Sequence, residues 1–155
     1  MNKIPSLTDY QDWFEKAKHD YKILNKSNEI FDLVDCLLSL NALPEWVSKS
    51  DHATERLKNL ANEKIMVMKG IKFKLDTSKI GRDIDHQLRF IRIFCNHSKH
   101  GDGNNTPIIV KEPGNTLPAT LPVEFITIIK IGDLRFNAKH IIYNVIDFWN
   151  KNINE

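Results

Sequence analysis

Apolar side chains recur at steps of three and four residues along most of the chain, which is the spacing of amphipathic helices. The pattern predicts five helices, over about Leu7–Asn25, from just after Ser27 to Leu40, over Asp51–Met68, over Ser78–Lys99, and from Asn137 to about Lys151. Ser6 or Thr8 suits the N-cap of the first helix, and Gly70 suits the end of the third. The second helix is apolar almost all round, so we expect it at the centre of the fold.

Proline and glycine interrupt this helical pattern. Pro44 cannot extend the second helix but suits the first turn of another, so a separate short helical turn is expected from Pro44 to Ser48. The stretch from Asp102 to Pro122 is rich in Gly, Pro, Asn and Thr, which indicates an irregular connection. Two β-branched runs, Ile108–Val110 and Glu124–Ile131, predict a hairpin across the turn residues 113–116.

The expected fold is mainly α, an up-and-down helical bundle of four to five helices with a small β-hairpin before the last helix. The 155 residues suit one domain over 1–155, with the loop and β-hairpin inserted at about 101–132. A hydrophobic content of 41% and a charged content of 27% are typical of a soluble globular protein.

Composition also excludes several classes of protein. No apolar run is long enough to span a bilayer, and the N-terminus lacks the apolar core of an export signal. Cys36 and Cys95 lie among apolar residues without metal-ligand spacing, which predicts buried thiols in a reducing compartment and hence a cytoplasmic location. A net charge of +2 is too small to indicate nucleic-acid binding by itself.

The distribution of charge is more informative than the total, because polar side chains gather at the end of the predicted fourth helix. Steps of four, three, four and four residues place five of them on one side, which we call the polar ridge: Asp85, Arg89, Arg92, Asn96 and His100. The opposite side carries the apolar residues Ile84, Leu88, Ile91 and Cys95. His86 and His97 flank the ridge, on the side away from Arg92.

The residue types of the polar ridge match the chemistry of a phosphodiester. The guanidinium of arginine presents a planar fork that fits phosphate, and histidine titrates near neutral pH. Together with the amide of Asn96, these groups suit binding a phosphate and moving protons on it. Asp85 precedes Arg89 by four residues, the favourable order for an ion pair on a helix surface.

Simpler interpretations stand beside this one. The ridge also fits a solvated helix face on which Lys99 and His100 complement the helix dipole. His97, His100 and Asp102 offer a metal site with too few ligands, so no metal or cofactor is expected. The lysines at 64, 69, 72 and 74 suit either phosphate contacts or a solvated face. The three tryptophans suit either base stacking or core packing.

Three passages of the first hundred residues resemble the HEPN superfamily, the helical nucleotide-binding proteins of prokaryotes and higher eukaryotes. The first helix carries Trp13-x3-Ala17-x2-Asp20-Tyr21, similar to the aromatic-Ala-Asp pattern near the start of those domains. Leu43-Pro-Glu-Trp-Val47 resembles a segment of bacterial proteins that also carry an Asn-x-x-Lys-His sequence, here Asn96-His-Ser-Lys-His100. Arg92 and His97 match the Arg-x(4–6)-His spacing of the family.

The resemblance implies a role for each residue of the site. Active relatives cut RNA without a metal, usually with two copies of the motif facing each other across a dimer. Arg92 would hold the scissile phosphate, His97 would act as general acid or base, and Asn96 would orient one of them. His100 competes with His97 for the proton-transfer role because it shares a face with Arg92. Arg89 and Lys99 would contact the substrate.

The function implied by this resemblance is that of an RNA-processing or RNA-binding protein, such as a metal-independent ribonuclease of a bacterial toxin–antitoxin or phage-defence system. The implied partners are RNA or a nucleotide, a second copy of the chain, and an antitoxin or other protein. Ile93 stands where active members often have a polar residue, which keeps open a non-catalytic helical binding module. A purely helical interaction protein with a solvated ridge is the third hypothesis.

Overall fold

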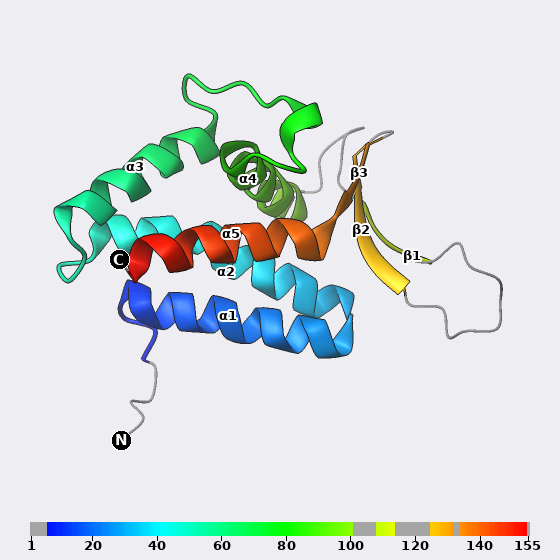
Figure 1. Cartoon of the computed structure of the whole chain (residues 1–155), viewed down its shortest axis with the longest axis horizontal. Coiled ribbons are helices and arrows are strands. Elements are labelled where there is room, and N and C mark those ends of the chain that lie inside the picture. Colours follow the sequence, from blue (N-terminus) through cyan, green and yellow to red (C-terminus); the bar gives the residue numbers. More distant parts are fainter. Residues whose placement is uncertain (1–5, 101–107, 114–124, 132–133, 155) are drawn as a thin grey trace.

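A computed structural model describes residues 6–100, 108–113, 125–131 and 134–154 (Figure 1), with only the backbone described for residues 97–100 and for some strand residues. In this part of the chain there are five α-helices: α1 (Tyr10–Ser27), α2 (Ile30–Lys49), α3 (Glu55–Lys69), α4 (Ile84–His100) and α5 (Ala138–Ile153). A short 3-10 helix, η1 (Thr77–Lys79), precedes α4. The three strands are β1 (Ile108–Pro113), β2 (Phe125–Ile131) and β3 (Leu134–Asn137). The predicted mainly α fold with a β-hairpin before the last helix is confirmed.

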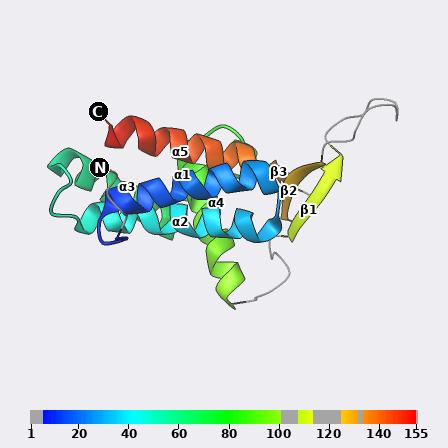
Figure 2. The same ribbon diagram turned by 90° about the horizontal axis from the view of Figure 1, so that it is seen from below.

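Helices α1 and α2 lie side by side, and α5 runs along them. Helix α4 has a different direction and crosses α2 (Figures 1 and 2). Figure 2 shows that the C-terminal turns of α4 project past the layer of α1 and α2. The sheet packs at one end of the bundle, against the N-terminal end of α5. The projecting turns are the end of α4 that carries Asn96 and His100, whereas Asp85 and Arg89 contact α3.

One hydrophobic core joins all five helices and strand β2. Leu88, Ile91 and Cys95 of the predicted apolar face are fully buried, which confirms that face. Phe90 and Phe94 are buried as well, so α4 is covered on more sides than the sequence pattern indicates. The ridge therefore lies on the narrow side of α4 that the core leaves free.

Pro44 does not start a new helical turn, because α2 continues through it to Lys49. Proline costs a helix about 3 kcal/mol or more through the lost hydrogen bond and the clash with the preceding turn. Here Pro44 is itself buried, and the continued helix also buries Val47, beyond the buried Leu40 and Leu43 that precede the proline. Core packing offsets the local cost, and α2 becomes the long central helix.

The start of the fourth helix is predicted six residues too early. Ile80 fits the apolar spacing and is fully buried, but it follows η1 in the connection to α4. The helix begins only after Asp83, whose Oδ1 accepts the backbone N–H of Asp85 at 3.0 Å and of His86 at 3.3 Å. The Asp83 cap, rather than the apolar spacing, therefore determines where α4 begins.

The sheet confirms the hairpin and adds a strand that the sequence pattern misses. β1 pairs antiparallel with β2, with Ile109 opposite Ile129. Of the predicted turn residues 113–116, Pro113 belongs to β1, opposite Phe125, and the other three lie outside the described residues. β3 pairs with the other side of β2, placing Phe136 opposite Ile129. The β3 sequence, Leu-Arg-Phe-Asn, does alternate apolar and polar residues, but four residues are the shortest run on which alternation indicates a strand. Asn137 caps α5 as predicted, accepting the His140 N–H at 3.2 Å.

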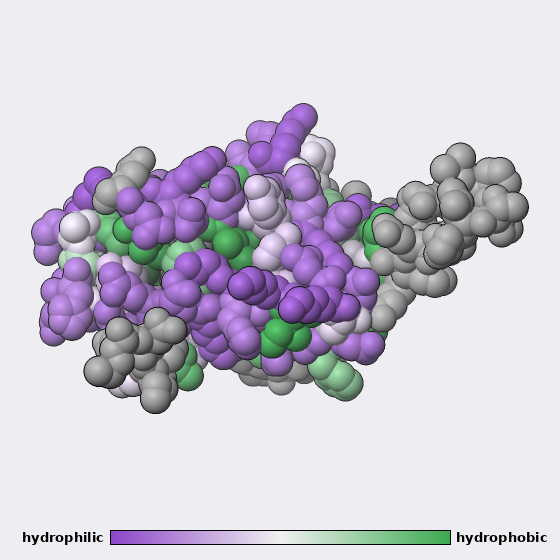
Figure 3. Space-filling model, turned by 60° about the horizontal axis from the view of Figure 1, so that its bottom comes forward, coloured by the Kyte–Doolittle hydropathy of each residue, from purple (hydrophilic) through white to green (hydrophobic). Residues whose placement is uncertain are grey.

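The described surface is mostly hydrophilic on the side drawn in Figure 3, where apolar side chains show only between polar ones. Phe31 at the start of α2 is the most exposed large apolar side chain described, at 83%. None of the described helices is long and apolar enough to cross a lipid bilayer.

Candidate functional site

The acidic start of the polar ridge faces α3 rather than Arg89. The Lys64 ammonium lies 2.8 Å from Asp85 Oδ1 and 5.6 Å from the centre of the Phe148 ring. Lys64 is only 7% exposed, so it does not belong to the solvated lysine stretch inferred from the sequence. The predicted Asp85–Arg89 pair is wrong because α3 places another cation against the same carboxylate.

Arg89 closes the end of α3. This helix ends in a Schellman motif, in which the Ile71 N–H bonds to the Met66 carbonyl and the Gly70 N–H to the Val67 carbonyl, both at 3.0 Å. The Met68 carbonyl points out of that motif and accepts Arg89 Nη1 at 2.7 Å. A cation at the C-terminal end of α3 also interacts favourably with the negative end of the helix dipole. Arg89 is thereby fixed in position on the ridge.

Gly70 should be hard to replace, because its φ is +74° and an added Cβ would lie 2.9 Å from Arg89 Nη2. A non-glycine residue in the left-handed region costs roughly 1–2 kcal/mol. We therefore expect Gly70→Ala to lower the free energy of unfolding by about that amount, measured by urea denaturation. The added contact with Arg89 should increase the loss.

Gly81 offers the matched control for this substitution. A Cβ built on Gly81 meets nothing within 4 Å, and its φ lies outside the left-handed region. Gly81→Ala should leave stability unchanged or raise it by a few tenths of a kcal/mol, through a less flexible unfolded chain. Equal losses in the two variants would contradict the fixed position assigned to Arg89.

Arg92 lies one turn further along the ridge and, like Arg89, is half-buried. Its side chain is 27% exposed, and Nη1 lies 4.0 Å from Glu45 Oε1 on α2. Burial, and then the nearby charge of Arg92, lower the pKa of Arg89. The Arg92–Glu45 contact is the only ion pair of either guanidinium among the described residues. Arg89 is compensated by the Met68 carbonyl and the end of α3 but has no carboxylate partner among those residues.

The remaining ridge residues complete the exposed end of α4. Asn96 is exposed one turn beyond Arg92. His97, Lys99 and His100 belong to the last turn of α4, and their side chains lie outside the described residues. The structure thus brings Arg89, Arg92 and Asn96 onto one face of a projecting helix.

His86, which flanks the ridge in the sequence pattern, has a structural position instead. It is 8% exposed, and its Nδ1 accepts the Asp76 N–H at 3.0 Å. Its ring packs against Phe73 with ring centres 4.8 Å apart. His86 therefore holds the segment between α3 and α4 and takes no part in the ridge.

A hollow beside Arg92 is the feature that the sequence pattern misses. A cavity of about 300 Å³ is lined by α2 and by the chain entering α1, through Thr8, Asp9, Ala42, Glu45, Trp46, Lys49 and Ser50. Glu45 borders both this cavity and Arg92. Trp46 stacks on Trp13, with ring centres 5.3 Å apart and planes 22° from parallel. The sequence identifies the segment around Pro44 as unusual. The hollow itself exists only because α2 packs against the chain that enters α1.

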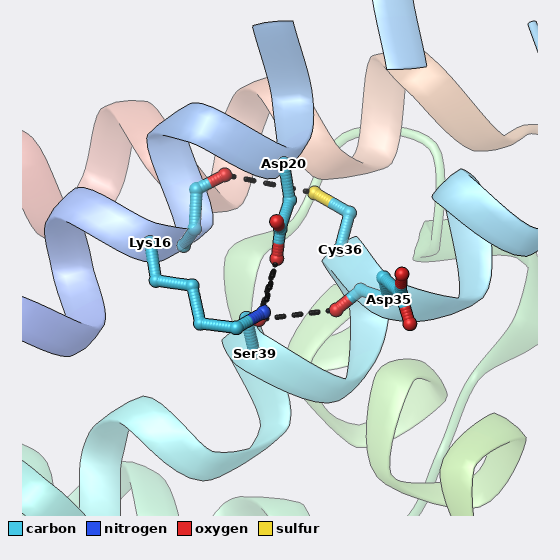
Figure 4. A network of polar contacts seen from close by, with 6 residues as sticks. Lys16, Asp20, Asp35, Cys36 and Ser39 are labelled. Atoms are coloured by element: carbon cyan, nitrogen blue, oxygen red, sulfur yellow. Dashed lines mark hydrogen bonds and ion pairs between the residues drawn. The ribbon is translucent and has the colours of Figure 1, made fainter. Parts of the chain in front are cut away.

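A second polar cluster, drawn in Figure 4, joins α1 to α2. Lys16 Nζ lies 2.7 Å from Asp20 Oδ2 and donates to Ser39 Oγ at 2.8 Å. Ser39 donates to the same Asp20 oxygen at 2.7 Å. A Ser–Lys nucleophile needs an accessible hydroxyl and a neutral amine, whereas Ser39 is 2% exposed and Lys16 is paired with a carboxylate. The cluster fastens the two helices together.

This cluster gives a physical reason for the Ala-Asp pattern in the first helix. Ala17 is fully buried where α1 approaches α2, and its carbonyl lies 3.8 Å from Cys36 Sγ. Burial, with a smaller contribution from Asp20, raises the pKa of the Cys36 thiol to about 12. Cys36 is therefore an inert thiol, as the sequence predicts.

No described group of three or more His, Cys, Asp or Glu side chains is placed to hold a metal ion. The set of His97, His100 and Asp102 considered from the sequence lies outside the residues whose side chains are described. Comparison of the chain with family models gives no match, and comparisons with curated proteins and with solved structures give no significant match.

Proposed function

We propose that the protein binds RNA along the polar ridge of α4 and cleaves it without a metal ion. The pairing of Arg89 and Arg92 carries this proposal. Two like charges close together repel each other and attract an anion. Arg89 is bound to the Met68 carbonyl, and the one ion pair of the two guanidinium groups among the described residues is the 4.0 Å contact of Arg92 with Glu45. Phosphate is the anion that best fits arginine forks.

The chemistry follows from the order of groups along α4. Arg92 grips the scissile phosphate, Arg89 adds positive charge behind it, and Asn96 donates to a phosphate oxygen or orients an imidazole. One histidine removes the proton of the ribose 2′-hydroxyl, whose oxygen attacks phosphorus. A second gives a proton to the departing 5′-oxygen, which leaves a 2′,3′-cyclic phosphate. His97 and His100 are the histidines we assign, from one copy of the chain or from two facing copies in a homodimer.

A row of exposed cations beside the ridge supports RNA as the substrate. Between residues 69 and 82 the exposed charged side chains are five cations and a single acid: Lys69, Lys72, Lys74, Lys79, Arg82 and Asp76. The Arg89–Met68 and His86–Asp76 hydrogen bonds hold the start and the middle of this stretch against α4. Its fixed position makes it a path for an RNA backbone rather than a loose charged loop.

Removing two of these cations should weaken RNA binding in a salt-dependent manner. For single strands, each phosphate contact contributes about 0.7 to the slope of log affinity against log salt concentration. We expect Lys72→Gln/Lys74→Gln to reduce that slope by about 1.4. The matched control is Lys22→Gln/Lys26→Gln, which removes two exposed lysines from α1 at the opposite edge of the molecule in Figure 1. Equal losses in both double variants would mean that the segment has no special role.

The test of the function itself is incubation of the purified protein with single-stranded RNA in excess chelator. We expect salt-dependent binding and products that end in cyclic phosphate. Tight binding without products would favour the non-catalytic binding module, for which the partial compensation of Arg92 by Glu45 is the structural argument. Neither binding nor cleavage by folded protein at micromolar concentration would refute the proposal.

The setting of this activity is part of the same proposal. RNA and reduced thiols occur together in the cytoplasm, and Cys36 and Cys95 are both buried and form no disulfide. We place the protein there, as a ribonuclease of a toxin–antitoxin or phage-defence system. An antitoxin or other protein that covers the projecting end of α4 would control it.

A further inference from the structure

We propose that the cavity beside Arg92 is a base pocket that selects guanine in single-stranded RNA. The inference rests on the proposed function, because the phosphate on Arg92 brings the RNA to the pocket. The pocket would allow the protein to discriminate between bases, which the polar ridge alone does not.

The pocket is placed where the base of a bound nucleotide would reach. Glu45 lines the cavity, and its Oε1 lies 4.0 Å from Arg92 Nη1. One side chain thus separates the phosphate-binding group from the hollow. The volume of about 300 Å³ lies at the small end of the range for ligand pockets, as a single base requires. Ala42 lines the same face of α2 and keeps the hollow open because its side chain is a methyl group.

Trp46 supplies an aromatic wall whose position is fixed. Its ring stacks on Trp13, and Trp13 Nε1 donates to the Leu7 carbonyl at 3.1 Å. The wall therefore needs little ordering when a base arrives, which lowers the entropic cost of binding. Proteins that read single-stranded RNA commonly place unstacked bases against aromatic rings and hydrogen-bond their edges.

The carboxylates decide which base fits. Asp9 is already engaged, since Ser50 donates to its Oδ1 at 2.7 Å and His52 Nδ1 lies 3.6 Å from its Oδ2. Glu45 is 44% exposed and is the carboxylate that remains available to a ligand. A carboxylate only accepts hydrogen bonds, through two adjacent oxygens. Guanine presents two adjacent donors, N1–H and the N2 amino group, on one edge.

The other three bases match this carboxylate less well. Adenine and cytosine each set an acceptor nitrogen beside their amino group, and uracil sets carbonyl oxygens on both sides of its single N–H. Each would therefore face a Glu45 oxygen with a lone pair. Lys49 lines the same cavity and offers a cation for the next phosphate, so the pocket can take a base without repelling the RNA backbone.

The test compares the affinities of five-nucleotide RNAs, four uridines with a central G, A, C or U, for the wild type and two pocket variants. A bidentate contact with a base is worth about 1–3 kcal/mol, so we expect guanine to bind roughly 5- to 100-fold more tightly than the others. Glu45→Gln should reduce this preference to within about twofold, since an amide carries one acceptor and one donor. Ala42→Leu should do the same by filling the hollow, and leaves Arg92 and Glu45 in place.

Controls separate this inference from the proposed function. Glu29→Gln removes an exposed carboxylate at the other end of α2 and should keep the guanine preference. Wild-type protein that binds all four RNAs equally overturns the pocket and leaves the ridge standing. A guanine preference that survives both Glu45→Gln and Ala42→Leu also overturns the pocket. Wild-type protein that binds none of the RNAs overturns the proposed function, and the pocket with it.

Discussion

Arg92→Ala is expected to lower the rate of RNA cleavage by roughly 10²–10³-fold, the usual loss when one group that stabilises transition-state charge is removed. The fold should survive, because Arg92 is partly exposed and its ion pair with Glu45 spans 4.0 Å. Pairs of that kind contribute about 0–1 kcal/mol to stability. Single-turnover cleavage of a labelled RNA, beside a urea denaturation curve, measures both quantities.

Arg135→Ala is the control for the loss of an arginine. Arg135 is exposed and pairs with Glu112 in the sheet. Its replacement should leave cleavage within about twofold of wild type, because it is not on α4 and its charge already has a carboxylate partner. A similar loss of activity in both variants would indicate a general effect of charge and would remove Arg92 from the site.

Asp85→Ala is expected to cost the fold about 2–3 kcal/mol, the largest stability effect we assign to the ridge. The change removes the nearer carboxylate of the Lys64 ammonium, which is 7% exposed, and leaves it only the exposed Glu63 carboxylate at 3.5 Å. The value lies below the full cost for a buried pair because the Asp85 side chain is 32% exposed and solvent screens part of its charge. Urea denaturation measures it directly.

The reason for this cost can be tested with a second substitution. Lys64→Met replaces the cation by an apolar chain of similar length, which suits its place over the Phe148 ring. The double variant Lys64→Met/Asp85→Ala should recover most of the stability lost by Asp85→Ala alone. Strictly additive losses would show that the two side chains do not interact.

The helices are largely predictable from the sequence because their apolar faces repeat at the helical step. The predicted helix boundaries are wrong where core packing or a polar N-cap, rather than the apolar spacing, determines the structure. Pro44 stays inside α2 because the helix face around it is buried. Ile80 keeps the spacing of the next helix but belongs to the connection, since Asp83 supplies the cap. β3 is stabilised by pairing with β2, which its own sequence does not reveal.

The candidate site is predictable only as far as one helix determines it. The spacing along α4 places Arg89, Arg92 and Asn96 on one face, and the structure keeps them there. The partners of these residues come from other helices: Lys64 and Met68 from α3, and Glu45 from α2. No local pattern contains those contacts. The cavity beside Trp46 likewise exists only where α2 meets the chain that enters α1.

The most direct test of RNA binding at the polar ridge is photo-crosslinking of a single-stranded RNA that carries thio-substituted uridines, followed by mapping of the attached peptides. Crosslinks are expected in the second half of α4 and in the part of α2 that includes Trp46, and Arg92→Ala should abolish them. Crosslinks confined to α1 or α5, or a wild-type pattern that Arg92→Ala leaves unchanged, would contradict the site.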